Sequence, residues 1–294
     1  LAKVKSVLVR STFDSGYTIL NADDDLVYRM RKIASCNVAL FSMDADSERI
    51  KKHCENDGLA AVIEDGYLVV YKGKWKTNIE KVTHIPLTVD GKASCMIKNI
   101  MPATLAAIIE GMSADEIREG LKTFIPSASN TPGRMNIFSF KKVEVMIDYA
   151  HNPDGFYQLQ QFMNEVKSPL KVGILSANGD RRDEDIVNIG KLAAEIFDEI
   201  IIKHDHDMRG RTKESVTHFL MEGISRVKSI PIKVISDETE AIQYALEHAE
   251  KGSFITICAD KIRYCIEQVS AAQDVEEKQD EVYAMPQLIL TRTA

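Results

Sequence analysis

The stretch that decides the fold is Thr131–Pro153, TPGRMNIFSFKKVEVMIDYAHNP, because it joins a turn to the first strand of a repeating pattern. The Thr-Pro-Gly triplet has turn chemistry, and Arg134 follows it directly. Apolar side chains then alternate with others at the two-residue period of a strand that ends at Asp148. Ligands of parallel α/β sheets bind at the carboxyl ends of the strands, so Asp148, His151 and Asn152 are candidate site residues.

Beyond this strand, helix and strand patterns alternate along the chain. Such alternation implies a mostly parallel sheet covered by helices, so we predict an α/β fold. The last two dozen residues have no clear period, and we expect a tail or an edge element there. The sequence predicts strands at 143–148, 171–176, 199–203, 233–236 and 254–258, and helices at 153–166, 184–197, 213–227, 239–250 and 261–269.

The residues before the stretch also mix helices and strands. Glu64-Asp65-Gly66 is a hairpin turn sequence between two strand patterns, and Ser113 with Glu116 predicts a capping box for a helix that ends at Phe124. Residues 125–133 have linker composition, with two Pro, two Ser, Asn, Thr and Gly. We therefore predict two domains, 1–130 and 131–294. Other patterns predict a helix at 3–10, strands at 17–20, 38–42, 60–63 and 67–71, and helices from about 26 and at 99–109.

The composition is that of an ordinary globular enzyme. With 294 residues the chain is long enough for two domains, and 45% hydrophobic with 28% charged residues is typical of folded proteins. A net charge of −7 argues against nucleic-acid binding. We find no apolar run of about 18 residues and no signal peptide, so we expect no membrane partner and a cytoplasmic location. The five cysteines are widely spaced without a C-x-x-C pair, which predicts buried thiols.

Two loops of the second domain carry charged side chains directly after predicted strands. The loop 176–183, SANGDRRD, opens a helix, so its backbone N–H groups and helix dipole suit an anion, and Asp180 suits a cationic substrate. The alternative is that Asp183 is a helix N-cap and the arginines are solvated. The loop 207–211, DMRGR, either binds a carboxylate or faces water. The sequence leaves both choices open.

Seven ordered motifs resemble the Mur ligase superfamily and, within it, the cyanophycin synthetase family. The resemblance covers nearly the whole chain, apart from the tail after about Ala272. It implies the remainder of a central ATP-binding domain at 1–130, a C-terminal Rossmann-like domain at 131–294, and an active site in the cleft between them. The motifs are LNADDDLV, IPLTVDGKA, GMSADEIREGLKTF, TPGRMNIF, DYAHNP, GDRRDEDI and MRGR.

The resemblance also implies a reaction. In the superfamily, ATP phosphorylates a carboxylate to an acyl phosphate, an amine attacks it, and an amide forms. ATP and Mg²⁺ are the implied cofactors. In the cyanophycin synthetase family this half joins arginine to aspartate side-chain carboxylates of a poly-aspartate backbone, so arginine and the polymer cyanophycin are the implied substrates. A homo-oligomer is expected, together with upstream domains of the same polypeptide.

The resemblance assigns roles to the nucleotide-side candidates. Arg134 is the first choice for catalysis, since a fixed guanidinium stabilises charge on a transferring phosphoryl group. Asp148 matches an aspartate that binds the ribose hydroxyls, with His151 and Asn152 beside the nucleotide. Asn99, at the predicted start of its helix, matches an asparagine near the adenine; its alternative role is a helix cap. Pro102 departs from the small residue expected there.

The amine-side and metal candidates follow in the same way. Asp180, Arg181 and Asp183 are implied to bind arginine, because a carboxylate suits a guanidinium, and Arg209 and Arg211 join them as substrate-binding candidates. Lys5 lies near a position where a carbamylated lysine helps to hold magnesium. Its alternative interpretation is an exposed helix lysine.

A further expectation rests on an absent motif. The chain has no G-x-x-x-x-G-K-[ST], the loop that cradles phosphates. In the superfamily this loop lies upstream, so we expect a fragment and predict that this chain alone has no ligase activity. Two alternatives stay open: another Mur-type amino-acid ligase, and a non-catalytic nucleotide-binding or assembly module.

Overall fold

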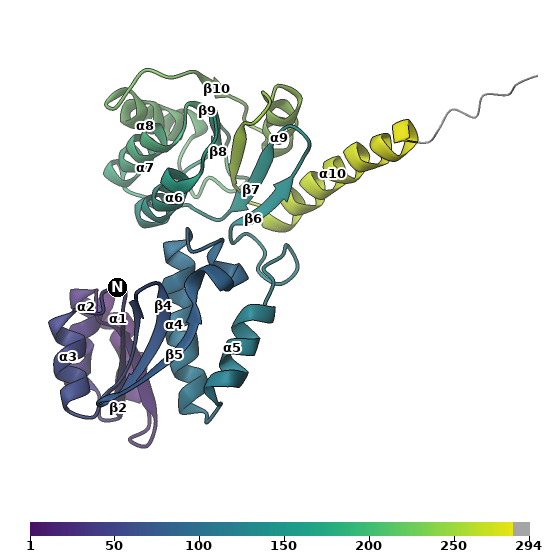
Figure 1. Ribbon diagram of the computed structural model, residues 1–294. Helices are drawn as coiled ribbons and strands as arrows, with labels where there is room; N and C mark the ends of the chain where they lie inside the picture. The colour runs from purple at the N-terminus through teal and green to yellow at the C-terminus, as the bar shows by residue number, and fades with distance from the viewer. Residues whose placement is uncertain (285–294) are drawn as a thin grey trace, which may run out of the picture. The chain divides into compact units, whose positions relative to one another are not determined.

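The computed structural model describes residues 1–284, with side chains up to Glu276. The chain divides into two compact units, Leu1–Ile125 and Pro126–Ala294, and this junction lies inside the predicted linker. Each unit is an α/β domain with its own sheet (Figure 1). Within the described residues no helix is long and apolar enough to cross a membrane.

The first unit has a five-stranded sheet in which the strands follow one another in chain order. The first three strands are parallel and the last two are antiparallel. The predicted hairpin is confirmed, because Asp65 and Gly66 connect its strands with φ angles of 51° and 76°. The strands are β1 (Tyr17–Asn21), β2 (Asn37–Ser42), β3 (Leu59–Glu64), β4 (Tyr67–Lys72) and β5 (Trp75–Lys81), the last of which was not predicted.

Helices pack through buried side chains on this sheet. One core contains Ile100 and Leu105 of α4 with Ile117 of α5, and another contains Val9 of α1 and Ile50 of α3. The predicted capping box of α5 is confirmed by reciprocal bonds between its serine and glutamate. The helices are α1 (Ala2–Ser11), α2 (Asp25–Arg29), α3 (Glu48–Glu55), α4 (Ser94–Ile109) and α5 (Ala114–Thr123), with 3-10 turns η1 (Met30–Ile33), η2 (Val82–His84) and η3 (Pro86–Thr88).

The predicted start of α4 was wrong. The helix begins at Ser94, so Asn99 lies in its interior and not at its start. Met96 and Ile97 are buried in this early part, and their packing extends the helix toward the N-terminus. The alternative role of Asn99 as a cap is therefore excluded, since Ala93 is the N-cap. Pro102 is accommodated inside the helix.

The second unit has a six-stranded sheet in the order β10-β9-β8-β11-β7-β6. Five strands are parallel and β6 is antiparallel to β7, which confirms the predicted mostly parallel sheet. Short β6 was not predicted. The strands are β6 (Asn136–Ser139), β7 (Glu144–Asp148), β8 (Lys171–Leu175), β9 (Glu199–Ile202), β10 (Ile232–Val234) and β11 (Phe254–Cys258).

Helices cover both faces of this sheet (Figure 1). Helices α6 (Pro153–Glu165), α7 (Asp183–Ile196) and α8 (Lys213–Ser225) lie together on one face. Helices α9 (Glu238–Glu247) and α10 (Ile262–Ala284) bury Ala241, Ile242, Cys265 and Val269 on the other. All five cysteines are free; three are buried as predicted, whereas Cys54 and Cys95 are partly exposed.

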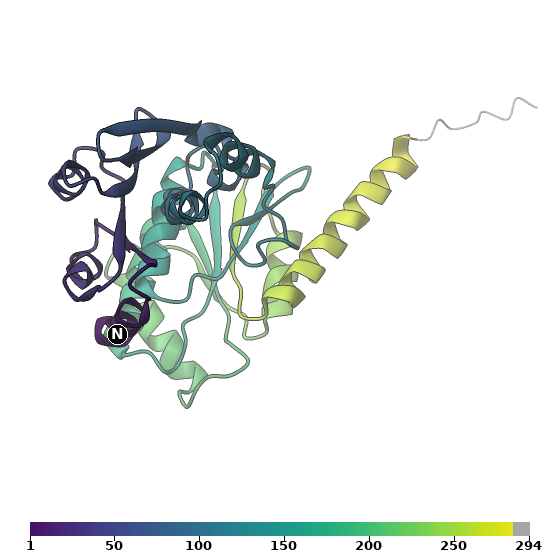
Figure 2. The ribbon, with the colours of Figure 1, turned by 90° about the horizontal axis from the view of Figure 1, so that it is seen from below.

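The C-terminal helix is longer than predicted. α10 continues to Ala284, whereas a tail was predicted there because the segment shows no clear apolar period. The segment 271–284 has no Pro or Gly, and two side chains tie it to β6 and the following loop: Gln273 donates to Ser139 O at 2.8 Å, and Glu276 accepts from Lys141 N at 2.9 Å. Beyond them the helix extends away from the sheet (Figure 2). The rest of the predicted tail lies outside the described residues.

Candidate functional site

Most of the candidate residues lie at the carboxyl edge of the second sheet. Strands β8 and β11 are neighbours there, yet β8 leads to α7 on one face and β11 leads to α10 on the other. This divergence is a topological switch point, where open α/β sheets bind ligands. A small cavity of about 20 Å³ opens at this point. Its lining comes from the end of β11 and from the loops after four strands: Tyr149, Ala150, His151, Ser176, Asn178, Asp205, Arg209, Cys258, Ala259 and Asp260.

The loop that carries Arg134 has a constrained backbone. Gly133 has φ +68° and Met135, a non-glycine residue, has φ 50°. A side chain on Gly133 would meet Ile262 Cδ1 at 2.7 Å. Buried Asn136 fixes the turn, because its Oδ1 accepts from Gly133 N at 2.7 Å and its Nδ2 donates to Thr131 O at 2.9 Å. Asn136 was not predicted, although an amide three residues after the glycine of a Thr-Pro-Gly turn was a usable signal.

Arg134 itself is exposed and has few internal contacts. Its Nη1 donates to Gly133 O at 3.2 Å, and its guanidinium lies 5.6 Å from the centre of the Tyr149 ring. Asp148 ends β7, as predicted, and its Oδ2 accepts from Met135 N at 3.1 Å. Burial raises the pKa of the Asp148 carboxyl, against the lowering effects of the Met135 N–H and the Arg134 charge.

His151 and Asn152 follow β7 at the same edge. The His151 Nδ1 lies 2.9 Å from Tyr149 O, and because a carbonyl only accepts, Nδ1 carries a proton and Nε2 is the acceptor of the neutral ring. The Asn152 side chain accepts from Gly155 N at 2.8 Å and caps α6, with Pro153 in the first turn. The N-terminus of α6, capped by Asn152, therefore lies at the carboxyl edge of the sheet.

The two charged loops after β8 and β9 lie against each other. Asp180 accepts from Arg209 Nη1 at 3.1 Å, and Asp183 lies 2.7 Å from Arg211 Nη1. Arg211 also donates to Gly179 O at 3.0 Å. The carboxylates that the sequence assigned to a substrate guanidinium are thus paired with arginines of this chain.

Two details of these loops correct the sequence analysis. Asp183 is the first residue of α7 and Arg182 is its N-cap, so the alternative interpretation of Asp183 as the N-cap was wrong. Arg181 is only partly exposed, and its Nε is buried without a hydrogen-bond partner in the described structure. The loops can approach so closely because position 179 is glycine: a Cβ there would lie 1.9 Å from Met208 O.

A buried lysine beside this edge was not predicted. Lys203 follows β9, its side chain is 0% exposed, and its Nζ lies 2.8 Å from Glu238 and 3.2 Å from Asp205. Burial lowers its pKa, but Glu238 and Asp205 more than offset that effect and raise it overall. Glu238 also accepts from the backbone N–H of Asp260 at 2.8 Å. The signal in the sequence was a lysine that closes an apolar strand.

The remaining two candidates belong to the first unit. Asn99 donates to Met96 Sδ at 3.9 Å within α4. Lys5 is exposed on α1. Among the described side chains no group of three or more His, Cys, Asp or Glu is arranged to hold a metal ion, so these residues do not by themselves fit a magnesium site. The role of Lys5 stays a prediction.

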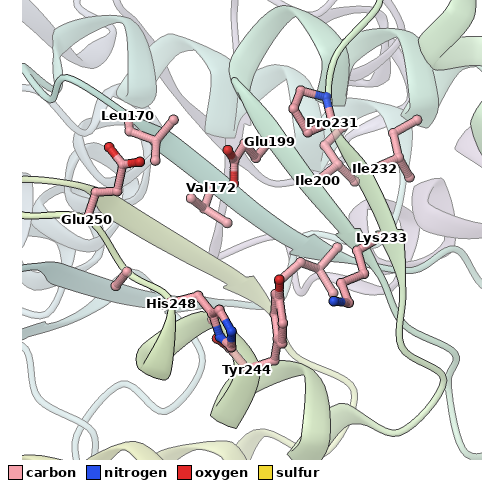
Figure 3. Close-up of a pocket in the computed structure, with 13 residues that line it drawn as sticks. Leu170, Val172, Glu199, Ile200, Pro231, Ile232, Lys233, Tyr244, His248 and Glu250 are labelled. Atoms are coloured by element: carbon pink, nitrogen blue, oxygen red, sulfur yellow. The ribbon is translucent and has the colours of Figure 1, made fainter.

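A second cavity lies at the opposite edge of the same sheet (Figure 3). It has a volume of about 320 Å³ and lies at the amino ends of β8, β9 and β10. Tyr244 forms part of its wall, with Lys233 Nζ 3.8 Å from the ring centre and His248 stacked at 4.0 Å. None of the candidate residues lines this cavity.

Comparison with known proteins shows the fold of the chain and the proteins to which it is homologous. Residues 133–260 match the family described as Mur ligase, glutamate ligase domain, and this range holds every candidate of the second unit. Over 279 residues the chain is 42% identical to a cyanophycin synthetase of Trichormus variabilis, with 95% of this chain and 31% of the relative covered. The chain is homologous to the Mur ligase family. It is also homologous to the cyanophycin synthetases, and it spans 31% of the length of these first relatives.

Ligases of peptidoglycan and folate metabolism are less similar to the chain. A UDP-N-acetylmuramoyl-L-alanyl-D-glutamate–2,6-diaminopimelate ligase of Aquifex aeolicus is 27% identical over 83% of this chain and 46% of that protein. E. coli FolC in complex with DHPP and ADP superimposes with a TM-score of 0.63 at 17% identity, over 91% of this chain and 57% of that one. MurF from Thermotoga maritima in complex with ADP gives 0.57 at 14% identity, over 95% and 57%. These structures show that the chain has a Mur ligase-like α/β fold.

Proposed function

We propose that this chain is part of an ATP-dependent ligase that joins arginine to aspartate side-chain carboxylates of a poly-aspartate polymer. The observation that carries the proposal is the arrangement of Arg134, Asp148 and His151 at the switch-point edge of a Mur ligase-like domain, in a chain 42% identical to a cyanophycin synthetase. Because the chain spans 31% of that relative, the activity belongs to a longer enzyme that contains it.

The nucleotide side of the proposed site is built on the loop before β6 and the end of β7. When bound, ATP supplies the phosphoryl group that activates the acceptor carboxylate. Arg134 is exposed and held by a constrained turn, so its guanidinium is free to bind phosphate oxygens. One oxygen of Asp148 accepts the Met135 N–H, and the other is proposed to accept from the ribose hydroxyls. His151 and the N-terminus of α6 at Asn152 lie beside them.

The amine side is built on the two charged loops. Asp180 and Asp183 form ion pairs with Arg209 and Arg211. In the proposed site these ion pairs hold the two loops together and so determine the shape of the carboxyl edge of the sheet. Arg209 also lines the small cavity with His151. The α-carboxylate of the incoming amino acid is a group that such an arginine can bind through charge-assisted hydrogen bonds.

The first unit is assigned by the same proposal. Residues 1–130 are proposed to be the remainder of a central ATP-binding domain, with Asn99 near the adenine, and residues 131–294 to be the Rossmann-like C-terminal domain. Magnesium and the carbamylation of Lys5 remain predictions, because the described side chains form no metal-binding group. The chain alone is proposed to be inactive, since it lacks a phosphate-cradling loop.

The test is phosphate release by the enzyme that contains this chain, given ATP, magnesium and an aspartate-bearing polymer, with each amino acid supplied separately. Release that depends on arginine supports the proposal. Release with a different amino acid would contradict the substrate and retain the ligase activity. Absence of release with every amino acid would favour the non-catalytic nucleotide-binding or assembly role.

A further inference from the structure

Because the two charged loops pair with each other, the side chain of the incoming amino acid needs a different binding place. Arginine brings a cationic guanidinium, and Asp180 and Asp183 already hold internal guanidinium groups. An additional guanidinium needs carboxylates with spare acceptor positions and space around them. The carboxyl edge of the second sheet offers both at one place.

That place is a cavity of about 490 Å³ at the carboxyl ends of β9, β10 and β11. Its volume falls within the range of pockets that hold small molecules. Helix α9 begins in its wall and Tyr264 of α10, 48% exposed, borders it. The lining residues are His204, Asp205, His206, Lys213, Ser236, Asp237, Glu238, Thr239, Asp260, Lys261 and Tyr264.

The charged side chains that line this cavity are held in place, and the acidic ones outnumber the basic ones. Four carboxylates line it against two lysines, and buried Lys203 lies behind Glu238 and Asp205. Asp260 accepts from His206 N at 2.9 Å, and Asp237 caps α9 by accepting from Glu240 N at 3.1 Å. One formal negative charge remains after Lys203 is counted. Free arginine carries one formal positive charge, with two cationic groups and one carboxylate.

A second observation at this edge also points to a ligand. The large cavity shares Asp205 and Asp260 with the small one beside Arg209. The small cavity is lined by Ser176, which is 6% exposed, and whose Oγ has no hydrogen-bond partner within the described structure. A buried hydroxyl without a partner is costly unless a water or a ligand satisfies it.

We propose that the large cavity holds the cationic side chain of the incoming amino acid, with Asp237 and Asp260 facing the guanidinium and Tyr264 beside its plane. Glu238 is excluded, because its oxygens already accept from Lys203 and from the backbone N–H groups of Asp260 and Lys261. The α-amino end then points to the small cavity lined by Ser176 and His151. This inference rests on the proposed function and specifies where its amine substrate is recognised. A flat aromatic ring beside a guanidinium adds a cation–π contact.

The test uses variants of the enzyme that contains this chain. Asp237→Asn removes a charge and keeps the N-cap, because Asn caps as well as Asp. It is expected to raise the KM for arginine about tenfold with little change in kcat. Tyr264→Ala is expected to raise the KM severalfold. Citrulline, which has the shape of arginine without the charge, should inhibit the Asp237→Asn enzyme nearly as well as the wild type.

Matched controls separate recognition from folding. Asp24 caps α2 in the first unit in the same way, so Asp24→Asn repeats the change away from the cavity. Tyr157 is 49% exposed on α6, and Tyr157→Ala is the control for Tyr264. Thermal melting checks that each variant is folded.

Three outcomes decide the inference. A higher KM for arginine in the cavity variants alone supports it. An enzyme that uses arginine with an unchanged KM in both cavity variants would overturn the cavity assignment and leave the proposed function standing. An enzyme that uses only uncharged or acidic amino acids would overturn both.

Discussion

Asp148 Oδ2 accepts the backbone N–H of Met135 at 3.1 Å, so the carboxylate that ends β7 also fixes the loop that carries Arg134. Met135 has a φ of 50°, which is an uncommon conformation for a non-glycine residue. The bond holds this conformation from one side, and Asn136 holds the preceding turn from the other. The proposed phosphate-binding and ribose-binding residues are therefore parts of one rigid unit.

Replacement of Asp148 by Asn should raise the stability of the protein at neutral pH and weaken nucleotide binding. Burial raises the folded-state pKa of this carboxyl, so stability falls as the pH rises from the ordinary carboxyl pKa to the raised one. A neutral amide does not undergo this loss. We expect Asp148→Asn to be more stable than the wild type at neutral pH and equally stable well below the ordinary carboxyl pKa. Urea denaturation at both pH values measures this, and a less stable variant at neutral pH would contradict it.

The same variant should bind nucleotide more weakly. A carboxylate accepts stronger hydrogen bonds from ribose hydroxyls than an amide does, so the Kd for ADP is expected to rise roughly 10- to 100-fold. Calorimetric titration of the enzyme that contains this chain gives the value. An unchanged Kd would remove Asp148 from the nucleotide site.

Gly179→Ala should force the two charged loops apart. The new Cβ would lie 1.9 Å from Met208 O and 2.9 Å from Arg211 Cβ, so we expect a loss of about 1–3 kcal/mol in the free energy of unfolding. Gly120→Ala is the control, because nothing lies within 4 Å of a Cβ there and alanine favours the helix by about 0.5–1 kcal/mol. If both variants were equally stable, the close approach of the loops would be refuted.

Lys203→Met should destabilise the second unit strongly. The change leaves Glu238 and Asp205 partly buried without their cation, at a cost of about 3–5 kcal/mol. Lys228→Met removes an exposed lysine 4.0 Å from Asp198 and should cost less than about 1 kcal/mol. Denaturant midpoints compare the two. A small loss for Lys203→Met would mean that the network contributes little to the carboxyl edge.

Local patterns in the sequence predicted most of the fold. The strand–helix alternation after residue 143 gave the parallel sheet, since buried parallel strands are continuous apolar runs. The two strands that were missed, β5 and β6, are short or exposed edge strands with little apolar periodicity. Helix α3 was also missed, since Ile50 is its one buried residue and it has no apolar face of several residues. Helix α10 was cut short for the same reason, because none of the side chains from 271 to 276 is buried.

The sequence predicted which residues belong to the candidate site but not which of them form ion pairs with one another. Sequence motifs located Arg134, Asp148 and the two charged loops. They could not show that Asp180 pairs with Arg209 across 29 positions, since that contact depends on the sheet order. Lys203 was missed because burial of a charged side chain is decided by the fold, in this case by Glu238 reaching it from α9.

Arg134 is proposed to act on the transferring phosphoryl group of an arginine-adding ligase. The most direct test of this role is the turnover of the Arg134→Ala enzyme with ATP, arginine and the aspartate-bearing polymer. The Arg182→Ala enzyme is the control and is measured in the same assay. Arg182 is exposed and, within the described part of the chain, forms ion pairs only with Glu184 and Asp185, so its loss should leave turnover nearly unchanged. We predict that Arg134→Ala lowers kcat by about 10²–10³. Equal turnover of the two variants would contradict this role of Arg134.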